Sequence, residues 1–291
     1  MKDFAGRTAV ITGAGSGFGR EFARIGAQLG MRLVLADIQR DALDATLAEV
    51  QAGGADAIAL AGDVSRGSDV DALAEAAFSR FGTVDLLFNN AGVGGAGGLV
   101  WEASERDWQW VLGVNTWGVI HGIRAFVPRM LAQGNDCHVV NTASVAGLLS
   151  AQMMGVYNVS KHAVVTLSET LFHDLRVVGA QMGVSVLCPA FVPTGIHESE
   201  RNRPESLRDE AEPTASQLAA RAAGAKAVTS GRISAAQVAQ TTFDAIRERR
   251  FYVLTHPKIL QSVELRMQDI VAQRNPTDPF TYKPDVAYKP A

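Results

Sequence analysis

The sequence predicts a doubly wound α/β fold, in which helices cover both faces of a parallel sheet of about seven strands. Three observations lead to this prediction. Short β-branched or apolar runs alternate with longer segments of helical period, as in βαβ units. Several runs are apolar almost without interruption, which is expected when both faces of a sheet are buried. The chain has 291 residues, 47% of them hydrophobic, and can therefore bury a large core, as one large domain or two small ones.

The predicted elements follow one another in a regular order. Strands are expected at seven runs, which read TAVIT, RLVLAD, DAIALAGD, VDLLFNN, HVVNTAS, GVSVLCPA and RFYVLT. Helices are expected from about Phe18, Asp41, Asp69 and Ser104, and a further helix carries Tyr157 and Lys161. No repeat and no internal linker divides the chain, so residues 1–291 are expected to form a single domain.

Two stretches interrupt this order. Residues 195–231 combine charges with short helical pieces and follow a strand end, which favours a lid over a site; a peripheral helical insertion is the alternative. The C-terminal extension, residues 256–291, ends in a proline-rich stretch that is either a tail or an arm on a neighbouring subunit. Phe280, Tyr282 and Tyr288 favour an ordered arm, because they give it apolar surface to bury.

The charge balance and the cysteines restrict the partners and the compartment. A net charge of -3 without a Lys/Arg-rich run argues against binding to nucleic acid or anionic lipid and favours small, roughly neutral molecules. The N-terminus has neither a signal-peptide core nor an apolar run of membrane-spanning length. Cys137 and Cys188 lie at the ends of predicted strands, which suits buried free thiols and a cytoplasmic location.

A glycine-rich turn, TGAGSGFG from Thr12 to Gly19, follows the first predicted strand and opens the first helix. In this context Gly13, Gly17 and Gly19 allow a tight turn and a close approach of the backbone to a pyrophosphate. The free N–H groups and the dipole at the helix N-terminus then stabilise the negative charge. The alternative is a glycine-rich turn that binds no ligand.

Asp37 ends the second predicted strand, about 20 residues after the glycine turn. A carboxylate at this point accepts hydrogen bonds from the adenosine ribose and repels a 2'-phosphate, which favours NAD over NADP. Arg40 could instead reach a phosphate, whereas Ile38 beside Asp37 is not basic. Asp37 could also be the N-cap of the following helix.

These motifs, in this order, resemble the classical branch of the short-chain dehydrogenase/reductase family from about Arg7 to Thr194. The resemblance implies a Rossmann-type domain that oxidises alcohols or reduces ketones with NAD(P), usually as a dimer or tetramer. It implies cofactor contacts at Gly13, Ser16, Gly17, Phe18, Gly19, Asp37, Asp63, Val64, Asn90, Ala91, Gly92, Tyr157, Lys161, Pro189, Val192 and Thr194. Ala190 departs from the family, which usually has glycine there.

The same resemblance identifies a catalytic set of Asn115, Ser144, Tyr157 and Lys161, all of which are present. Tyr157 and Lys161 are four residues apart and so share one face of a helix. In the family the tyrosine is the acid or base, the lysine lowers its pKa and binds the nicotinamide ribose, and the serine stabilises the substrate oxygen. The asparagine would hold a water that links the lysine to solvent.

The chemistry explains why these residue types are needed. A free tyrosine has a pKa near 10, and lowering it to about 7 requires roughly 4 kcal/mol of phenolate stabilisation. The Lys161 ammonium and the positive nicotinamide ring are the available opposite charges. The alternatives are that Ser144 caps a turn and that Asn115 satisfies a helix kink.

The expected substrate is a hydrophobic or aromatic secondary alcohol or ketone. Beside Ser144 and Tyr157, the expected walls of its pocket are mostly apolar, namely Val93, Leu148, Leu149, Met153, Met154, Phe191 and His197. Two alternatives remain. An NADPH-dependent carbonyl reductase would need Arg40 to override Asp37, and a non-catalytic nucleotide-sensing protein would have no use for the complete catalytic set.

Other candidates are assigned to packing. His162 and His173 are expected to be surface or packing histidines, because the tyrosine already serves as acid and base. The four tryptophans, expected in the core or in interfaces, are Trp101, Trp108, Trp110 and Trp117. No spacing of Cys, His and carboxylate indicates a metal site. The helices that carry Asn115 and Tyr157 form the usual subunit interface of the family, so a homodimer or homotetramer is expected.

Overall fold

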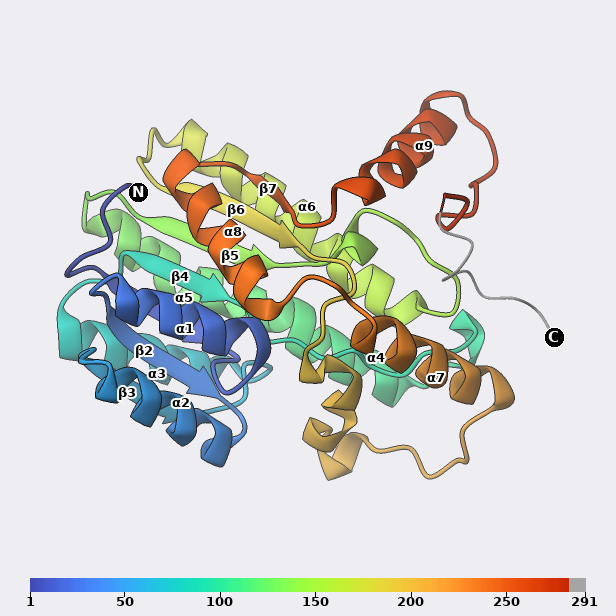
Figure 1. The fold of residues 1–291 in the computed structure, drawn as a ribbon, viewed down its shortest axis with the longest axis horizontal. Helices are drawn as coiled ribbons and strands as arrows, with labels where there is room; N and C mark the ends of the chain where they lie inside the picture. The colour runs from blue at the N-terminus through green and yellow to red at the C-terminus, as the bar shows by residue number, and fades with distance from the viewer. Residues whose placement is uncertain (283–291) are drawn as a thin grey trace.

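Seven parallel strands form one sheet in the computed structural model, which describes residues 1–282 (Figure 1). The strands are β1 (Thr8–Thr12), β2 (Arg32–Asp37), β3 (Ala57–Ala61), β4 (Leu86–Asn89), β5 (His138–Thr142), β6 (Gly183–Cys188) and β7 (Tyr252–Leu254). Their order across the sheet is β3-β2-β1-β4-β5-β6-β7. The predicted fold class and the seven predicted strands are confirmed.

Helices cover both faces of this sheet (Figure 1). The helices are α1 (Gly17–Gln28), α2 (Arg40–Ala52), α3 (Gly67–Phe81), α4 (Glu105–Leu112), α5 (Gly118–Ala132), α6 (Gly155–Val177), α7 (Ala215–Thr229), α8 (Ala235–Glu248) and α9 (Leu260–Val271). Helices α1, α2 and α8 pack on one face, and α3, α5 and α6 pack on the other. The long helix predicted from about Ser104 is α4 and α5, joined by a π-helical segment, Gly113–Trp117.

A hydrophobic core lies on each face of the sheet, and the strands contribute side chains to both cores. They do so because successive side chains of a strand point to opposite faces. In β2, Leu33 and Leu35 pack with α1 and α8, whereas Val34 packs with α3. On the first face Phe22 of α1 stacks on Phe88 of β4, with ring centroids 4.4 Å apart. This double burial explains why the strands are apolar at nearly every position.

Strands β2 and β3 are added on one side of β1, whereas β4 to β7 are added on its other side. The connections that follow β1 and β4 therefore lead to opposite sides of the sheet. Such a switch point leaves a crevice at the carboxyl ends of the strands. Asn90 spans it, donating from its side chain to Thr12 O and from its backbone to Thr12 Oγ1, at 2.9 Å each. The predicted cofactor and catalytic residues flank this crevice.

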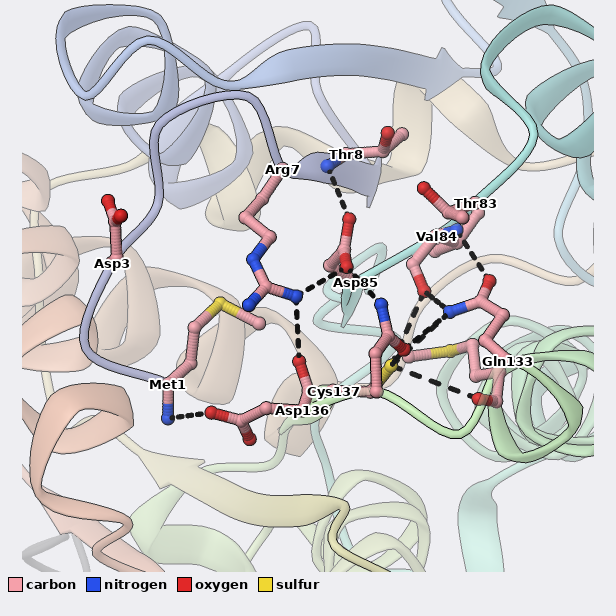
Figure 2. Close-up of polar contacts among 12 residues, drawn as sticks. Met1, Asp3, Arg7, Thr8, Thr83, Val84, Asp85, Gln133, Asp136 and Cys137 are labelled. Atoms are coloured by element: carbon pink, nitrogen blue, oxygen red, sulfur yellow. Dashed lines mark hydrogen bonds and ion pairs between the residues drawn. The ribbon is translucent and has the colours of Figure 1, made fainter.

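The opposite, amino-terminal edge of the sheet is joined by a network of polar contacts (Figure 2). Asp85 is 2% exposed and accepts hydrogen bonds from Thr8 N and from the Arg7 guanidinium, each at 2.9 Å. Gln133 accepts from Val84 N and donates to Val84 O. These contacts fix β1, β4 and the connection before β5 to one another, at a distance from the crevice.

Residues 195–231, called the covering segment below, extend over the carboxyl edge of the sheet. They form short 3-10 helices at Gly195–Asn202 and Glu205–Leu207, followed by α7, which packs on Gly97 and Gly98. A 3-10 turn, Pro257–Ile259, leads into α9, which projects from the body of the molecule. Of the aromatic residues proposed to order a C-terminal arm, Tyr288 lies outside the described residues.

Two further observations concern the described residues as a whole. Cys137 and Cys188 are buried free thiols, as predicted, and burial raises the pKa of each to about 12. None of the helices within residues 1–282 is both long and apolar enough to cross a membrane.

Candidate active site

One cavity of about 650 Å³ runs along the carboxyl edge of the sheet and collects most of the predicted site residues. Its lining includes Ser144 and, of the predicted cofactor positions, Gly13, Ser16, Gly17, Phe18, Asp37, Asp63, Val64, Asn90, Ala91, Gly92, Tyr157, Lys161, Pro189, Val192 and Thr194. The predicted residues that do not line it are Gly19, Asn115 and Leu148.

The glycine turn has the geometry that an anion site requires. Gly13 and Gly17 have φ angles of 68° and 53°, which residues with a Cβ rarely adopt. Helix α1 begins at Gly17, and the Ser16 side chain makes no capping hydrogen bond to its first N–H groups. These groups therefore fit a phosphate. Gly19 has a packing function, since a Cβ there would lie 2.0 Å from Gly13 O.

Asp37 lies at the adenosine end of the predicted cofactor path. Its Oδ2 accepts from Gly15 N at 2.8 Å and its Oδ1 accepts from Gln39 N at 2.9 Å. The N-cap of α2 is Gln39, so the alternative assignment of Asp37 as the N-cap is wrong. Arg40 does not line the cavity and instead forms an exposed ion pair with Asp44 at 2.8 Å.

Helix α6 brings Tyr157 and Lys161 to the other end of the cavity. Lys161 is 2% exposed; its Nζ lies 5.7 Å from the centroid of the Tyr157 ring and donates to Thr142 O at 3.0 Å. Ser144 Oγ accepts from Ala146 N at 3.1 Å and hydrogen-bonds Tyr157. Ser144 thus caps the turn after β5 and also contacts the tyrosine, so its two proposed functions are compatible.

Burial controls the ionisation of this pair. It raises the pKa of Tyr157 to about 12, against the lowering effect of the hydrogen bond from Ser144. It lowers the pKa of Lys161 to about 8. The protein's own groups desolvate the phenolate more than they stabilise it, so the lowered pKa expected from the sequence depends on the positive nicotinamide ring in addition to Lys161.

Asn115 lies in the π-helical segment, fully buried, and fixes the loop after β4 to α6. Its Oδ1 accepts from Val93 N at 2.8 Å, and its Nδ2 donates to Val93 O at 3.0 Å and to Ser160 Oγ at 3.1 Å. Both N–H donors of the amide are therefore used by the protein. At Gly92 an added Cβ would lie 3.3 Å from Asn115 Oδ1 and 3.4 Å from Lys161 Nζ, so Asn115 and Lys161 converge on this backbone position.

Most of the residues expected as substrate walls line the cavity. The cavity is lined by Val93, Leu149, Met153, Met154, Phe191 and His197. Leu148 instead packs against a buried cluster that includes Val164. Trp110, which the sequence assigned to packing, is 2% exposed and also lines the cavity. By contrast, Trp101 and Trp117 are 77% and 52% exposed, so a core location was wrong for them.

The covering segment closes the cavity with residues that the motifs did not identify. Helix α7 approaches so closely that a Cβ on Gly97 would lie 2.5 Å from Ala220 Cβ. Ser199 Oγ accepts from Gly94 N at 2.9 Å, and Ser216 hydrogen-bonds Glu102. Pro279 and Phe280 line the same cavity from the C-terminal extension of this chain. Small residues at 94–98 were the available sequence signal, because they permit such close packing.

The remaining candidates lie elsewhere. His162 and His173 do not line the cavity; His162 Nδ1 lies 2.9 Å from Asn158 O, and the His173 ring packs edge-on against Phe172. Among residues 1–282, no three His, Cys, Asp or Glu side chains are grouped as ligands of a metal ion. Gly15, which the sequence analysis did not select, lines the cavity and donates to Asp37.

Known proteins resemble this chain in both sequence and fold. Residues 7–205 match the short chain dehydrogenase family. A short chain dehydrogenase/reductase from Burkholderia phymatum, solved in complex with NAD, is 62% identical, with a TM-score of 0.94 over 96% of this chain and 99% of that one.

Two curated relatives extend the comparison. The CLA biosynthesis dehydrogenase/reductase of Lactiplantibacillus plantarum is 34% identical over 95% of this chain and 97% of its own. The 1-deoxy-11-beta-hydroxypentalenate dehydrogenase of Streptomyces avermitilis is 36% identical over 86% and 84%. With a family match over more than half of its length, and with the predicted parallel sheet observed, the chain belongs to the short-chain dehydrogenase family, an oxidoreductase family.

Proposed function

We propose that the protein transfers a hydride between NAD(H) and a hydrophobic or aromatic secondary alcohol or ketone, with Tyr157 as the acid or base. One observation carries the proposal. Tyr157, Ser144 and Lys161 line the same cavity as the glycine turn and Asp37, so a dinucleotide bound on the turn extends toward the tyrosine. The apolar walls at that end would hold the carbon skeleton of the substrate.

The choice of NAD rests on Asp37 and on the position of Arg40. The Asp37 carboxylate is half-buried in the cavity, where it would accept hydrogen bonds from ribose hydroxyls and repel a 2'-phosphate. The Arg40 guanidinium is held on the outer surface by Asp44. The NAD complex of the Burkholderia phymatum relative supports the same choice.

The proton chemistry follows from the surroundings of Tyr157. A bound oxidised NAD supplies the hydride acceptor and a positive charge. Burial raises the pKa of Tyr157 to about 12, so at neutral pH the phenol is protonated and has a proton to donate to a ketone oxygen. To act as a base toward an alcohol, it depends on Lys161 and that positive charge to stabilise its phenolate. Ser144 would donate to the substrate oxygen, and Asn115 would hold the backbone beside Lys161 in place.

The substrate class rests on the lining of the reacting end. Val93, Leu149, Met154, Phe191 and Trp110 present apolar surface there. The Streptomyces avermitilis relative is named as a dehydrogenase of a hydroxylated compound, which supports alcohol oxidation as the reaction.

A panel of secondary alcohols, with aromatic carbinols and steroids included, tests the proposal through the absorbance of NADH. We expect turnover with NAD on members of the apolar set. Tyr157→Phe should lower turnover by about a thousandfold or more, with NAD affinity nearly unchanged. Unchanged turnover in this variant would refute the role of Tyr157, and a tenfold preference for NADP would refute the cofactor assignment.

We also propose that the protein is a homodimer or homotetramer in the reducing cytosol. Trp117, beside Asn115, and Val159 on α6 are 52% and 49% exposed, on the helices that form the usual interface of the family. Two buried free thiols suit a reducing compartment.

A further inference from the structure

The first part of the covering segment crosses the cofactor side of the cavity and is held there by side chains. Gln39 Nε2, two residues after Asp37, donates to Asn202 Oδ1 at 2.6 Å. The next residue, Arg203, places its guanidinium 2.8 Å from the Asp107 carboxylate, and both side chains are only 2% exposed. These contacts hold the backbone of the segment directly after Arg201.

The Arg201 guanidinium lines the cavity and contacts the backbone of Gly195. It donates from Nη1 to Gly195 O at 3.1 Å, and its Nη2 lies 3.3 Å from the position that a Cβ on Gly195 would take. The adjacent residue, Thr194, lies 3.5 Å from the corresponding Cβ position of Gly17, where α1 begins. Arg201 therefore stands beside the segment that contacts the predicted pyrophosphate site.

Arg201 is one of four basic residues that line the cavity within residues 1–282, and His197 among them lies with its Nδ1 3.0 Å from Thr194 O. The lining contains Lys161, His197, Arg201 and Arg221 as basic side chains. Lys161 lies at the reacting end, and Arg221 belongs to α7, whose residues pack on Gly97 and Gly98. Arg20 of α1 is paired with Glu49 at 2.8 Å and does not line the cavity.

The Arg201 charge is only weakly compensated. Its acidic neighbour Glu198 lies 3.8 Å away and is 66% exposed, so solvent screens this pair. Since Nη1 is used by Gly195 O, the guanidinium still has Nη2 and Nε to donate. A planar guanidinium with free donors matches the oxygens of a phosphate.

We propose that Arg201 binds the diphosphate of the dinucleotide and thereby couples the position of the covering segment to cofactor binding. This inference rests on the dinucleotide cofactor of the proposed function. In this proposal the Arg201 side chain adds a cation to a diphosphate site otherwise built from backbone N–H groups. Cofactor binding would then also favour the position of the covering segment that forms the substrate pocket.

Isothermal titration with NAD⁺ and with ADP-ribose, which has the diphosphate but no nicotinamide, tests the inference by binding alone. For Arg201→Ala we expect Kd to rise about tenfold for both ligands, or about 1.4 kcal/mol. Arg201→Lys should raise Kd for both ligands by less than Arg201→Ala does, because it keeps the charge but loses the planar guanidinium. Arg208→Ala is the matched control, since Arg208 is exposed and does not line the cavity.

Three results would overturn the inference: both ligands binding Arg201→Ala within about twofold of the wild type, a loss confined to NAD⁺ that ADP-ribose does not show, or a wild type that binds neither ligand. The proposed function can fail separately. If the wild type binds both ligands but oxidises no alcohol of the panel, the reaction is wrong, whereas a tenfold loss in Arg201→Ala still supports the diphosphate contact.

Discussion

Replacing Lys161 with methionine is expected to stabilise the protein while impairing its proposed reaction. The ammonium is 2% exposed, and burial lowers its pKa from 10.5 to about 8. At pH 7 the group is charged in both states, so the folded state carries a desolvation cost of roughly 3 kcal/mol, at 1.36 kcal/mol per pKa unit. Methionine has a similar unbranched shape without the charge, and the lost hydrogen bond to Thr142 O costs about 1 kcal/mol. The free energy of unfolding of Lys161→Met should therefore exceed that of the wild type by about 2 kcal/mol.

The pH dependence of this gain identifies its cause. The pKa of Lys161 is lower in the folded state than in the unfolded state, so between about pH 8 and 10.5 the unfolded state binds more protons. As the pH rises through this range, Lys161 therefore destabilises the folded state less. By pH 9 roughly 1 kcal/mol of the cost has gone. The stability difference between Lys161→Met and the wild type should therefore shrink by that amount from pH 7 to pH 9.

Urea unfolding at both pH values, followed by tryptophan fluorescence, measures the difference. Lys258→Met is the control; Lys258 is exposed, and its replacement should change stability by less than about 0.5 kcal/mol at either pH. The reasoning is refuted if Lys161→Met is less stable than the wild type at pH 7, or if its advantage is the same at both pH values.

Three other substitutions give further tests. Asp37→Ser should raise the ratio of kcat/KM for NADP to that for NAD about tenfold, because it removes a repulsion of about 1–2 kcal/mol between the carboxylate and the 2'-phosphate. An unchanged ratio would exclude Asp37 as the group that selects the cofactor. Gly122→Ala should destabilise by about 1–3 kcal/mol in urea, because its Cβ would lie 1.9 Å from Asn89 Oδ1, whereas Gly224→Ala, with no heavy atom within 4 Å, should not destabilise. Trp117→Glu should dissociate the proposed oligomer in light scattering; an unchanged mass would place the interface elsewhere.

The sequence predicts the sheet and the reacting end of the site well because their signals are local. The strands read as apolar runs, since both of their faces are buried, and all seven lie where those runs occur. Tyr157 and Lys161 meet because four residues separate them on one helix. The glycine turn is recognisable because it stands directly between a strand and a helix.

The parts that the sequence could not predict depend on distant segments. Phe280 reaches the cavity only because the chain returns after α9, and no local pattern encodes that return. Trp110 looks like any core aromatic, although it faces the cavity. The direction of the Tyr157 pKa depends on burial by the whole fold, whereas the sequence shows only its charged neighbour.

The polar network at the amino-terminal edge has a consequence for engineering. Asp85, Arg7 and Gln133 join the strands at the end of the sheet opposite the cavity, and none of them lines it (Figure 2). The stability they provide thus comes from side chains other than those that line the cavity. Residues 204–231 can accordingly be exchanged with those of a relative to test whether they select the proposed substrate, with residues 195–203 kept to preserve the proposed cofactor contacts.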